Sequence, residues 1–443
     1  MDSFTKSILL ELLNFSTSRN QKLFVVGGTL RDFLSRKPCS DFDLTGKNAA
    51  ELGTGFARSL NFTCIPLDKT PGRKTSRVIL DQKQHLDFTD LQGRNIEEDL
   101  SQRDFTINAM GLLLADFLSG RKNTIDPHKG QEDLINKKIR VLPGPIISSD
   151  PLRMLRAFRF AATLGFEIDE GTLNEISLHK TKLCESASER IWHELTLFLK
   201  VPNTLPLLKI MQDCGLLNCL FPVSDEIRTI GQYQQLEQLL QDLNEVFPKY
   251  ADAFNANAFL NKHYLLKISI LLRGMNQSPA PATGESFPDI QESNLNPSNA
   301  EMKSMSQALN GASSLTEMYS EDHHGQNEIY ELITKIHEEL LASTILFITD
   351  FSSQDRPDAE NRVLFCNNLL KFYYKQFLPV MNNKPLLNGE DIIHQFSLSP
   401  SPLFGKILNC IQKAQVLGSI ATRDDAIALA KNIIQSQTKE SNA

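Results

Sequence analysis

The sequence predicts an α+β domain at the N-terminus followed by all-α domains. Strand-like runs are confined to the first part of the chain and are clearest at residues 22–26, 77–80 and 85–90. From residue 150 onward, apolar residues recur at three- and four-residue spacing, which is typical of helices. A chain of 443 residues is also long for a single hydrophobic core. We therefore expect a head domain over residues 1–145, with a mixed sheet and helices, and helical domains after it.

The composition is that of an ordinary globular protein, with 41% hydrophobic and 22% charged residues. No apolar run approaches the ~18 residues of a membrane span, and the first residues lack the basic and apolar segments of a secretory signal. The seven cysteines are scattered without a C-x-x-C pair, which favours reduced thiols over a zinc site or disulfides. We expect a cytoplasmic protein with no membrane partner.

A segment at 276–326 interrupts the helical pattern. It has few apolar residues and no sustained period, so it cannot bury enough surface to offset its chain entropy. Seven acids and one lysine in it account for −6 of the net charge of −7, so the remaining chain is close to neutral. We predict a disordered acidic insert, and the net charge does not exclude a polyanionic partner.

The helical part is expected to consist of three domains around this insert. They are a neck (146–220), a body (221–275 and 327–384) and a tail (385–443).

The most informative stretch begins with the strand-like Leu23–Val26 and the pair Gly27–Gly28. Glycine lets backbone N–H groups approach an anion, and Arg31 stands on the helix that should follow. Asp41 and Asp43 come next, on an expected strand where residues two apart point to one face, so both carboxylates can meet one hard cation. A phosphate-binding turn beside paired carboxylates predicts metal-assisted nucleotidyl transfer. The alternative is an ordinary strand–turn–helix start with a solvated Asp pair.

Two further groups carry possible chemistry. Arg103, Asp104 and Asn108 lie at a loop-to-helix transition, where Asp104 could accept from ribose hydroxyls and Arg103 could meet phosphate. Asp150 and Arg153, one helical turn apart, can together imitate the Watson–Crick edge of a base. Taken alone, each group is also explained by a capped helix with a surface ion pair.

The order of these motifs resembles a known family. LFVVGGTLRD…DFD, RDFTINAM, DPHKGQEDL, DPLRMLRAFRFAATLGF and SERIWHEL are similar, in this order over about 190 residues, to motifs A to E of the bacterial class II tRNA nucleotidyltransferases and their poly(A) polymerase relatives. A weaker resemblance, from Pro385 to Gly418, is to the C-terminal helical domain of long family members. The resemblance implies a polymerase β-like nucleotidyltransferase head followed by all-α RNA-binding domains.

The resemblance also implies site residues and ligands. Asp41 and Asp43 would be catalytic and bind two Mg²⁺ ions, with Asp87 as a possible third acid and Asp90 as its competitor. The implied nucleotide-binding residues are Gly27, Gly28, Arg31, Arg103, Asp104, Asn108, Asp150, Arg153 and Arg156. Glu189 and Arg190 of motif E would brace the preceding helix. The implied substrates are CTP, ATP or both, and the implied partner is the tRNA 3′ end; DNA is not expected.

Three positions depart from the family pattern. Ser149 replaces the usual Glu before the motif D Asp, and Gln102 replaces an Arg of motif B. Arg273–Gly274 stands where long relatives carry the His-Asp pair of a phosphohydrolase domain, so we expect a degenerate body without that activity. The connection 91–102 is short, whereas full CCA-adding relatives generally carry a longer flexible loop there, which weakly favours CC addition. The alternatives are a poly(A) polymerase and a catalytically inactive RNA-binding relative.

Overall fold

The computed structural model describes residues 3–39, 41–70, 74–82, 84–222, 225–275, 295–320, 325–350, 356–398 and 401–440. Its contacts divide the chain into two compact units, Met1–Leu220 with Asn294–Asn296 and Phe221–Ser293 with Pro297–Ala443. No helix in the described ranges is both long and apolar enough to cross a membrane.

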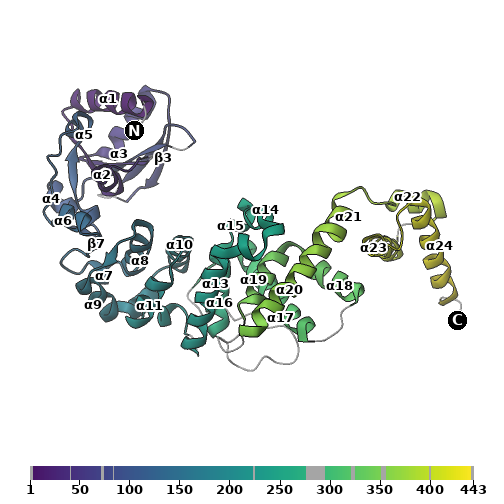
Figure 1. Cartoon of the computed structure of the whole chain (residues 1–443). Helices are drawn as coiled ribbons and strands as arrows, with labels where there is room; N and C mark the ends of the chain where they lie inside the picture. The colour runs from purple at the N-terminus through teal and green to yellow at the C-terminus, as the bar shows by residue number, and fades with distance from the viewer. Residues whose placement is uncertain are drawn as a thin grey trace. The chain divides into compact units, whose positions relative to one another are not determined.

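The first unit contains a six-stranded mixed sheet of order β3-β4-β5-β2-β1-β6. The sheet lies in the purple to blue part of the chain in Figure 1. Its strands are β1 (Leu23–Val26), β2 (Asp41–Gly46), β3 (Thr63–Asp68), β4 (Thr75–Ile79), β5 (His85–Asp90) and β6 (Gly111–Leu113). Strands β2 and β5 pair in parallel, and all other neighbours are antiparallel. The predicted α+β head with a mixed sheet is therefore confirmed.

Helices bury one face of this sheet. The core there joins side chains of the sheet to side chains of α1 (Ser3–Thr17), α3 (Ala49–Ser59) and α5 (Leu114–Ser119). Phe42 and Leu44 of β2 and Leu86 and Phe88 of β5 point into this core and are buried. Because side chains alternate along a strand, the aspartates between them face the opposite side. On that side α4 (Ile96–Leu100) packs against the end of β1.

The rest of the first unit is helical. Its elements are α2 (Gly27–Leu34), α6 (Gly130–Ile135), α7 (Ile146–Ser149), α8 (Arg153–Leu164), α9 (Glu170–His179), α10 (Ser188–Leu199), α11 (Leu205–Asp213) and α12 (Leu216–Leu220). A short parallel pair, β7 (Lys138–Ile139) and β8 (Glu167–Ile168), accompanies them. Packing of α8 on α10 places the neck side chains that enter the site.

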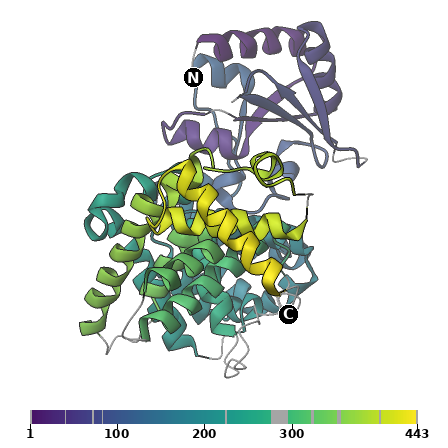
Figure 2. The same ribbon diagram turned by 90° about the vertical axis from the view of Figure 1, so that its right-hand side faces the viewer.

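The second unit is all-α in the described ranges. Its helices are α13 (Glu226–Val246), α14 (Ala251–Phe254), α15 (Asn257–Leu260), α16 (His263–Met275), α17 (Asn299–Ser320), α18 (Gln326–Ile336), α19 (Leu340–Ile348), α20 (Arg356–Phe372), α21 (Leu378–Asn382), α22 (Gly389–Phe396), α23 (Pro402–Val416) and α24 (Arg423–Glu440). The last three, drawn in yellow-green to yellow in Figure 2, share a core of their own around Ile392, Ile407 and Ile411.

The predicted disordered insert is wrong for residues 299–320, which form the helix α17. One face of α17 is buried, including Met305 and Leu315. Its packing against α19 is close, because a Cβ at Gly311 would lie 2.1 Å from Ser343 Oγ. Small residues such as Gly311 and Ala312 let a helix face pack closely although the sequence has no apolar period there. The helix was therefore not predicted from hydrophobic periodicity. The rest of the predicted insert includes 276–294 and 321–324, which lie outside the described residues.

Arg273 forms an ion pair in the second unit. Its Nη1 lies 3.2 Å from Asp350 Oδ1, and Gln232 donates to the same oxygen at 2.9 Å. This ion pair connects α16 to the residues that follow α19. The absence of phosphohydrolase activity stays a prediction.

Candidate active site

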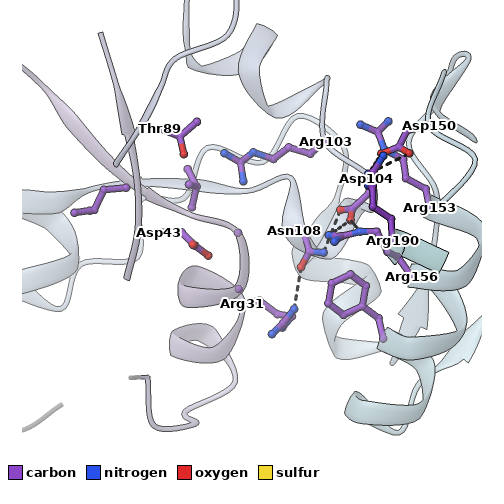
Figure 3. Close-up of a pocket in the computed structure, with 15 residues that line it drawn as sticks. Arg31, Asp43, Thr89, Arg103, Asp104, Asn108, Asp150, Arg153, Arg156 and Arg190 are labelled. Carbon is purple, nitrogen blue, oxygen red and sulfur yellow. Dashed lines mark hydrogen bonds and ion pairs between the residues drawn. The ribbon is translucent and has the colours of Figure 1, made fainter. Parts of the chain in front are cut away.

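A cavity of about 450 Å³ lies in the first unit between the end of β1, the motif B turn and the neck helices (Figure 3). Most of the residues singled out from the sequence line it. They are Gly27, Gly28, Arg31, Asp43, Arg103, Asp104, Asn108, Asp150, Arg153, Arg156 and Arg190. Asp41, Asp87 and Glu189 were also singled out but are not among its lining residues.

Three aspartates stand together on the open face of the sheet. Asp41 and Asp43 are two apart on β2, and Asp43 lies directly opposite Asp87 in the parallel register of β5. Asp90 has the opposite parity, and its Oδ1 accepts from the Ala50 N–H at 3.0 Å at the start of α3. The register therefore places Asp87, and not Asp90, beside the Asp pair.

Basic side chains contact two of these acids. Arg77 on β4 donates to both oxygens of Asp87 at 2.8 Å. His85 Nδ1 lies 3.0 Å from Asp41 Oδ1, and its Nε2 lies 3.7 Å from Asp87 Oδ2. Neither Arg77 nor His85 was identified from the sequence, because their acids become neighbours only when β4, β5 and β2 align.

Asp43 has the most unusual environment of the three. It is partly buried, and its removal from solvent raises the pKa of its carboxyl, while the Arg103 guanidinium opposes this rise. The turn beside it requires glycine at Gly27, where φ is +61° and a Cβ would lie 3.0 Å from Asp43 Oδ2. Thr29, overlooked in the sequence, joins turn and strand, because its hydroxyl donates to the Asp41 carbonyl at 2.9 Å and accepts from the Asp43 N–H at 2.7 Å.

The three aspartates supply only part of the ligands that a hard divalent cation needs. Within the described ranges, no three His, Cys, Asp or Glu side chains already form a metal cage. Mg²⁺ does not need one, because it is commonly held by one or two carboxylates together with substrate phosphates. A carboxylate whose pKa is raised by loss of solvent also gains from a nearby cation. Asp41 and Asp43 therefore suit a magnesium ion that arrives with a nucleotide.

A buried polar chain crosses the floor of the cavity. Arg31 donates to Asn108 Oδ1 at 2.9 Å, and Asn108 donates to Asp104 at 3.1 Å. Arg156 donates to Asp104 Oδ2 through Nε and Nη2, at 2.9 and 2.6 Å. Burial alone would raise the pKa of Asp104, but the Arg156 guanidinium and the hydrogen bonds hold that pKa below its ordinary value. Asp104 is therefore a fixed anionic acceptor.

Glu194 on α10 is a further member of this network that the sequence interpretation missed. It is buried, accepts from Arg159 at 2.5 Å and lies 3.5 Å from Arg156 Nη1. The ring of Phe160, which lines the cavity, has the guanidinium of Arg159 4.2 Å from its centroid. The only available signal was an acid within the buried apolar face of α10, and its partners lie 35 and 38 residues away.

The two expected base-reading residues line the same cavity with separate partners. Asp150 is paired with Arg190 Nη2 at 3.3 Å and does not cap a helix through its side chain. Arg153 donates to the carbonyl groups of Ile146 at 3.2 Å and Gln102 at 3.1 Å. Arg190 thus contacts the expected template residue, whereas Glu189 accepts from Asn296 at 2.8 Å, away from the cavity.

Three family models match successive parts of the chain. They describe a poly(A) polymerase head domain (residues 23–140), a probable RNA- and SrmB-binding site of polymerase A (165–227) and a putative tRNA nucleotidyltransferase domain 2 (364–430). The chain belongs to the tRNA nucleotidyltransferase and poly(A) polymerase family. The resemblance seen in motifs A to E is therefore confirmed.

Named relatives and solved structures agree with this family. The chain is 28% identical to a CC-adding tRNA nucleotidyltransferase of Geobacter sulfurreducens, covering 90% of this chain and 89% of that one. It is 25% identical to an A-adding tRNA nucleotidyltransferase of Deinococcus radiodurans, covering 92% and 94%. The Thermotoga maritima CCA-adding enzyme complexed with tRNA has the same fold, with a TM-score of 0.68, 21% identity and coverage of 99% and 96%. The polymerase β-like head with helical domains is thus confirmed.

Proposed function

We propose that this protein is a template-independent nucleotidyltransferase that adds nucleotides of the CCA terminus to the 3′ end of tRNA. The observation that carries the proposal is one cavity that holds the Gly27–Gly28 turn, the Asp43 carboxylate and the fixed acceptor Asp104. These are the groups needed for a triphosphate, a cation and a ribose. Relatives with nearly full-length coverage are named for CC or A addition to tRNA.

The residues of the cavity divide the binding of a nucleoside triphosphate between them. The amides at the start of α2 and the guanidinium groups of Arg31 and Arg103 would hold its phosphates. Asp104, held by Arg156 and Asn108, would accept hydrogen bonds from its ribose hydroxyls.

Asp41 and Asp43 would hold magnesium, with Asp87 beside them. When bound, two Mg²⁺ ions would favour ionisation of the RNA 3′ hydroxyl and stabilise charge on the α-phosphate as pyrophosphate leaves. The bond formed joins the 3′ oxygen to the α-phosphorus, and the bond broken releases pyrophosphate. Asp43, placed by Thr29 and the Gly27 turn, sets the point at which those oxygens must meet.

Base selection is assigned to Asp150 and Arg153. One supplies an acceptor and the other supplies donors, as reading the edge of a cytosine or adenine requires. The Asp150–Arg190 pair and the Arg153 hydrogen bond to the Gln102 carbonyl fix where these groups lie. The neck would thus select the base and bind RNA, and the body and tail would bind the rest of the tRNA.

We favour addition of the two cytidines alone. Only residues 91–95 separate β5 from α4. Such a short connection leaves little chain whose movement could change the base pocket from one that accepts cytosine to one that accepts adenine. One rigid pocket cannot favour both bases, because cytosine and adenine place their amino groups at different reach. Several similar relatives are named as CC-adding, whereas one is named as A-adding and others are named for addition of the whole CCA.

Incubation with tRNA lacking its last three nucleotides, CTP and ATP tests this proposal. The expected product ends after the second cytidine. A product completed with adenosine would refute CC specificity, and a long adenosine tail would support the alternative, a poly(A) polymerase. No incorporation of any nucleotide would support an inactive RNA-binding relative. A cytoplasmic location is part of the proposal, because all seven cysteines are free thiols.

A further inference from the structure

A second cavity, of about 840 Å³, opens at the other end of the same strands. The first cavity is lined by Val26 at the end of β1, Asp43 within β2 and Thr89 near the end of β5. The second is lined by Lys22 just before β1, Phe24 within β1 and Lys47 just after β2. The two cavities share no lining residue. Phe24 lies opposite Thr45 in the register and has the same parity as Val26, so the Phe24 side chain lies on the open face of the sheet.

Three lysines from separate segments converge on this second cavity. Lys22, Lys47 and Lys74 are exposed, and none forms an ion pair within the described part of the chain. The other charges of the cavity have partners: Arg94 is bonded to Glu98, and Asp90 accepts from the start of α3. Asp90 keeps its negative charge, because its donor is a neutral N–H group. The three lysines therefore leave a net positive charge around the cavity, which attracts an anion with several charges.

The wall and floor of this cavity suit a base and a ribose. Phe24 is only partly buried, so an edge or face of its ring is accessible, and base stacking on an aromatic ring is a common mode of nucleotide binding. The side chains of Asn20 and Asn48 supply amide donors and acceptors around it. Asn95 supplies a donor, because its Oδ1 already accepts from the Glu98 N–H as the cap of α4. An inorganic anion would contact the lysines alone. A nucleotide would contact the lysines through its phosphates and would also contact the amides and the aromatic ring.

We propose that this cavity is a second nucleotide-binding site, in which the lysines hold phosphate and Phe24 stacks on the base. The nucleotide is either free or part of an RNA strand. Its site touches the short connection that precedes motif B, since Leu91, Gly93 and Arg94 line it. The buried Asp99 ties this connection to the first cavity, accepting from the Gln92 N–H at 2.9 Å and from Arg103 at 3.0 Å. A bound nucleotide would therefore restrict the motion of the Arg103 side chain.

The test is direct binding by calorimetry to the full-length protein, so that it does not depend on incorporation. The variant is the triple substitution Lys22→Ala, Lys47→Ala and Lys74→Ala. The matched control is the triple substitution Lys6→Ala, Lys122→Ala and Lys137→Ala, which removes the same charge elsewhere on the head. The probes are ATP and a short oligoadenylate, each titrated at several salt concentrations, and melting temperatures verify that both variants fold.

The outcomes separate the two sources of the nucleotide. If the occupant is RNA, the variant binds oligoadenylate more weakly than wild type. The slope of log K against log salt also becomes shallower by about 2, as the loss of three phosphate contacts on a single strand predicts. If the occupant is a free nucleotide, the variant loses one equivalent of bound ATP and keeps the RNA slope. In either case Phe24→Leu lowers the affinity for the same ligand by about tenfold, because the stacking on the aromatic ring is lost. Variant, control and wild type behaving alike with both probes would overturn the proposal.

Discussion

Replacement of Arg156 by alanine should destabilise the first unit strongly, because it leaves a buried acid without its main cation. Asp104 is buried, and both of its bonds from Arg156 are short, at 2.6 and 2.9 Å. Removing one partner of a buried ion pair costs about 3–5 kcal/mol. The Arg156 side chain retains 33% exposure, so water can partly replace it, and the lower end, about 3 kcal/mol, is expected. For a unit of this size the melting temperature should fall by about 6–12 °C.

The loss of stability caused by Arg156→Ala should depend on pH in a defined direction. Arg156 holds the pKa of Asp104 below its ordinary value, so the pair contributes stability above the unfolded pKa near 4, and this contribution is lost as pH falls through the folded pKa. Without Arg156, burial raises that pKa, so the carboxyl takes up a proton as the pH is lowered. The difference in melting temperature between wild type and variant should therefore be largest near pH 7 and smaller near pH 5.

Two further variants isolate the buried charge as the cause. Arg121→Ala removes an exposed pair with Asp116 and should cost less than about 1 kcal/mol. Adding Asp104→Asn to Arg156→Ala removes the unpaired charge and should recover part of the lost stability. The reasoning fails if Arg156→Ala melts at the same temperature as Arg121→Ala at pH 7, or if its loss is the same at pH 5.

Other predictions address the acid pair, a turn and the corrected helix. Asp43→Asn should abolish nucleotide incorporation, while the melting temperature at pH 7 stays the same or rises. The reason is that the pKa of the Asp43 carboxyl is raised in the fold, so its negative charge lowers the free energy of unfolding. Turnover within about tenfold of wild type would refute the catalytic role. Lys129→Gly should raise the free energy of unfolding by about 0.5–1 kcal/mol in urea, since φ there is +59°, and a decrease would contradict this. Leu315→Ala should cost about 2–5 kcal/mol, whereas no change would argue that α17 is not part of the core.

Local patterns in the sequence were sufficient for much of the head. The alternation of β2 placed Asp41 and Asp43 on one face, because the period of a strand is set by the backbone alone. Gly27 was expected at a turn, and it has the positive φ that favours glycine. Composition misled the interpretation at α17, because packing through Gly311 and Ala312 depends on the surface of α19 and not on hydrophobicity within α17 itself.

By itself, then, the sequence determined which residue types recur at strand and helix spacing, and through the motif order it determined the family. Only the tertiary structure decided which charges meet. The choice of Asp87 over Asp90 depends on the register of β5 against β2, and the Arg156–Asp104 contact joins residues 52 positions apart. The physical reason is that backbone periodicity is a short-range property, whereas the partner of a buried charge is fixed by packing between elements distant along the chain.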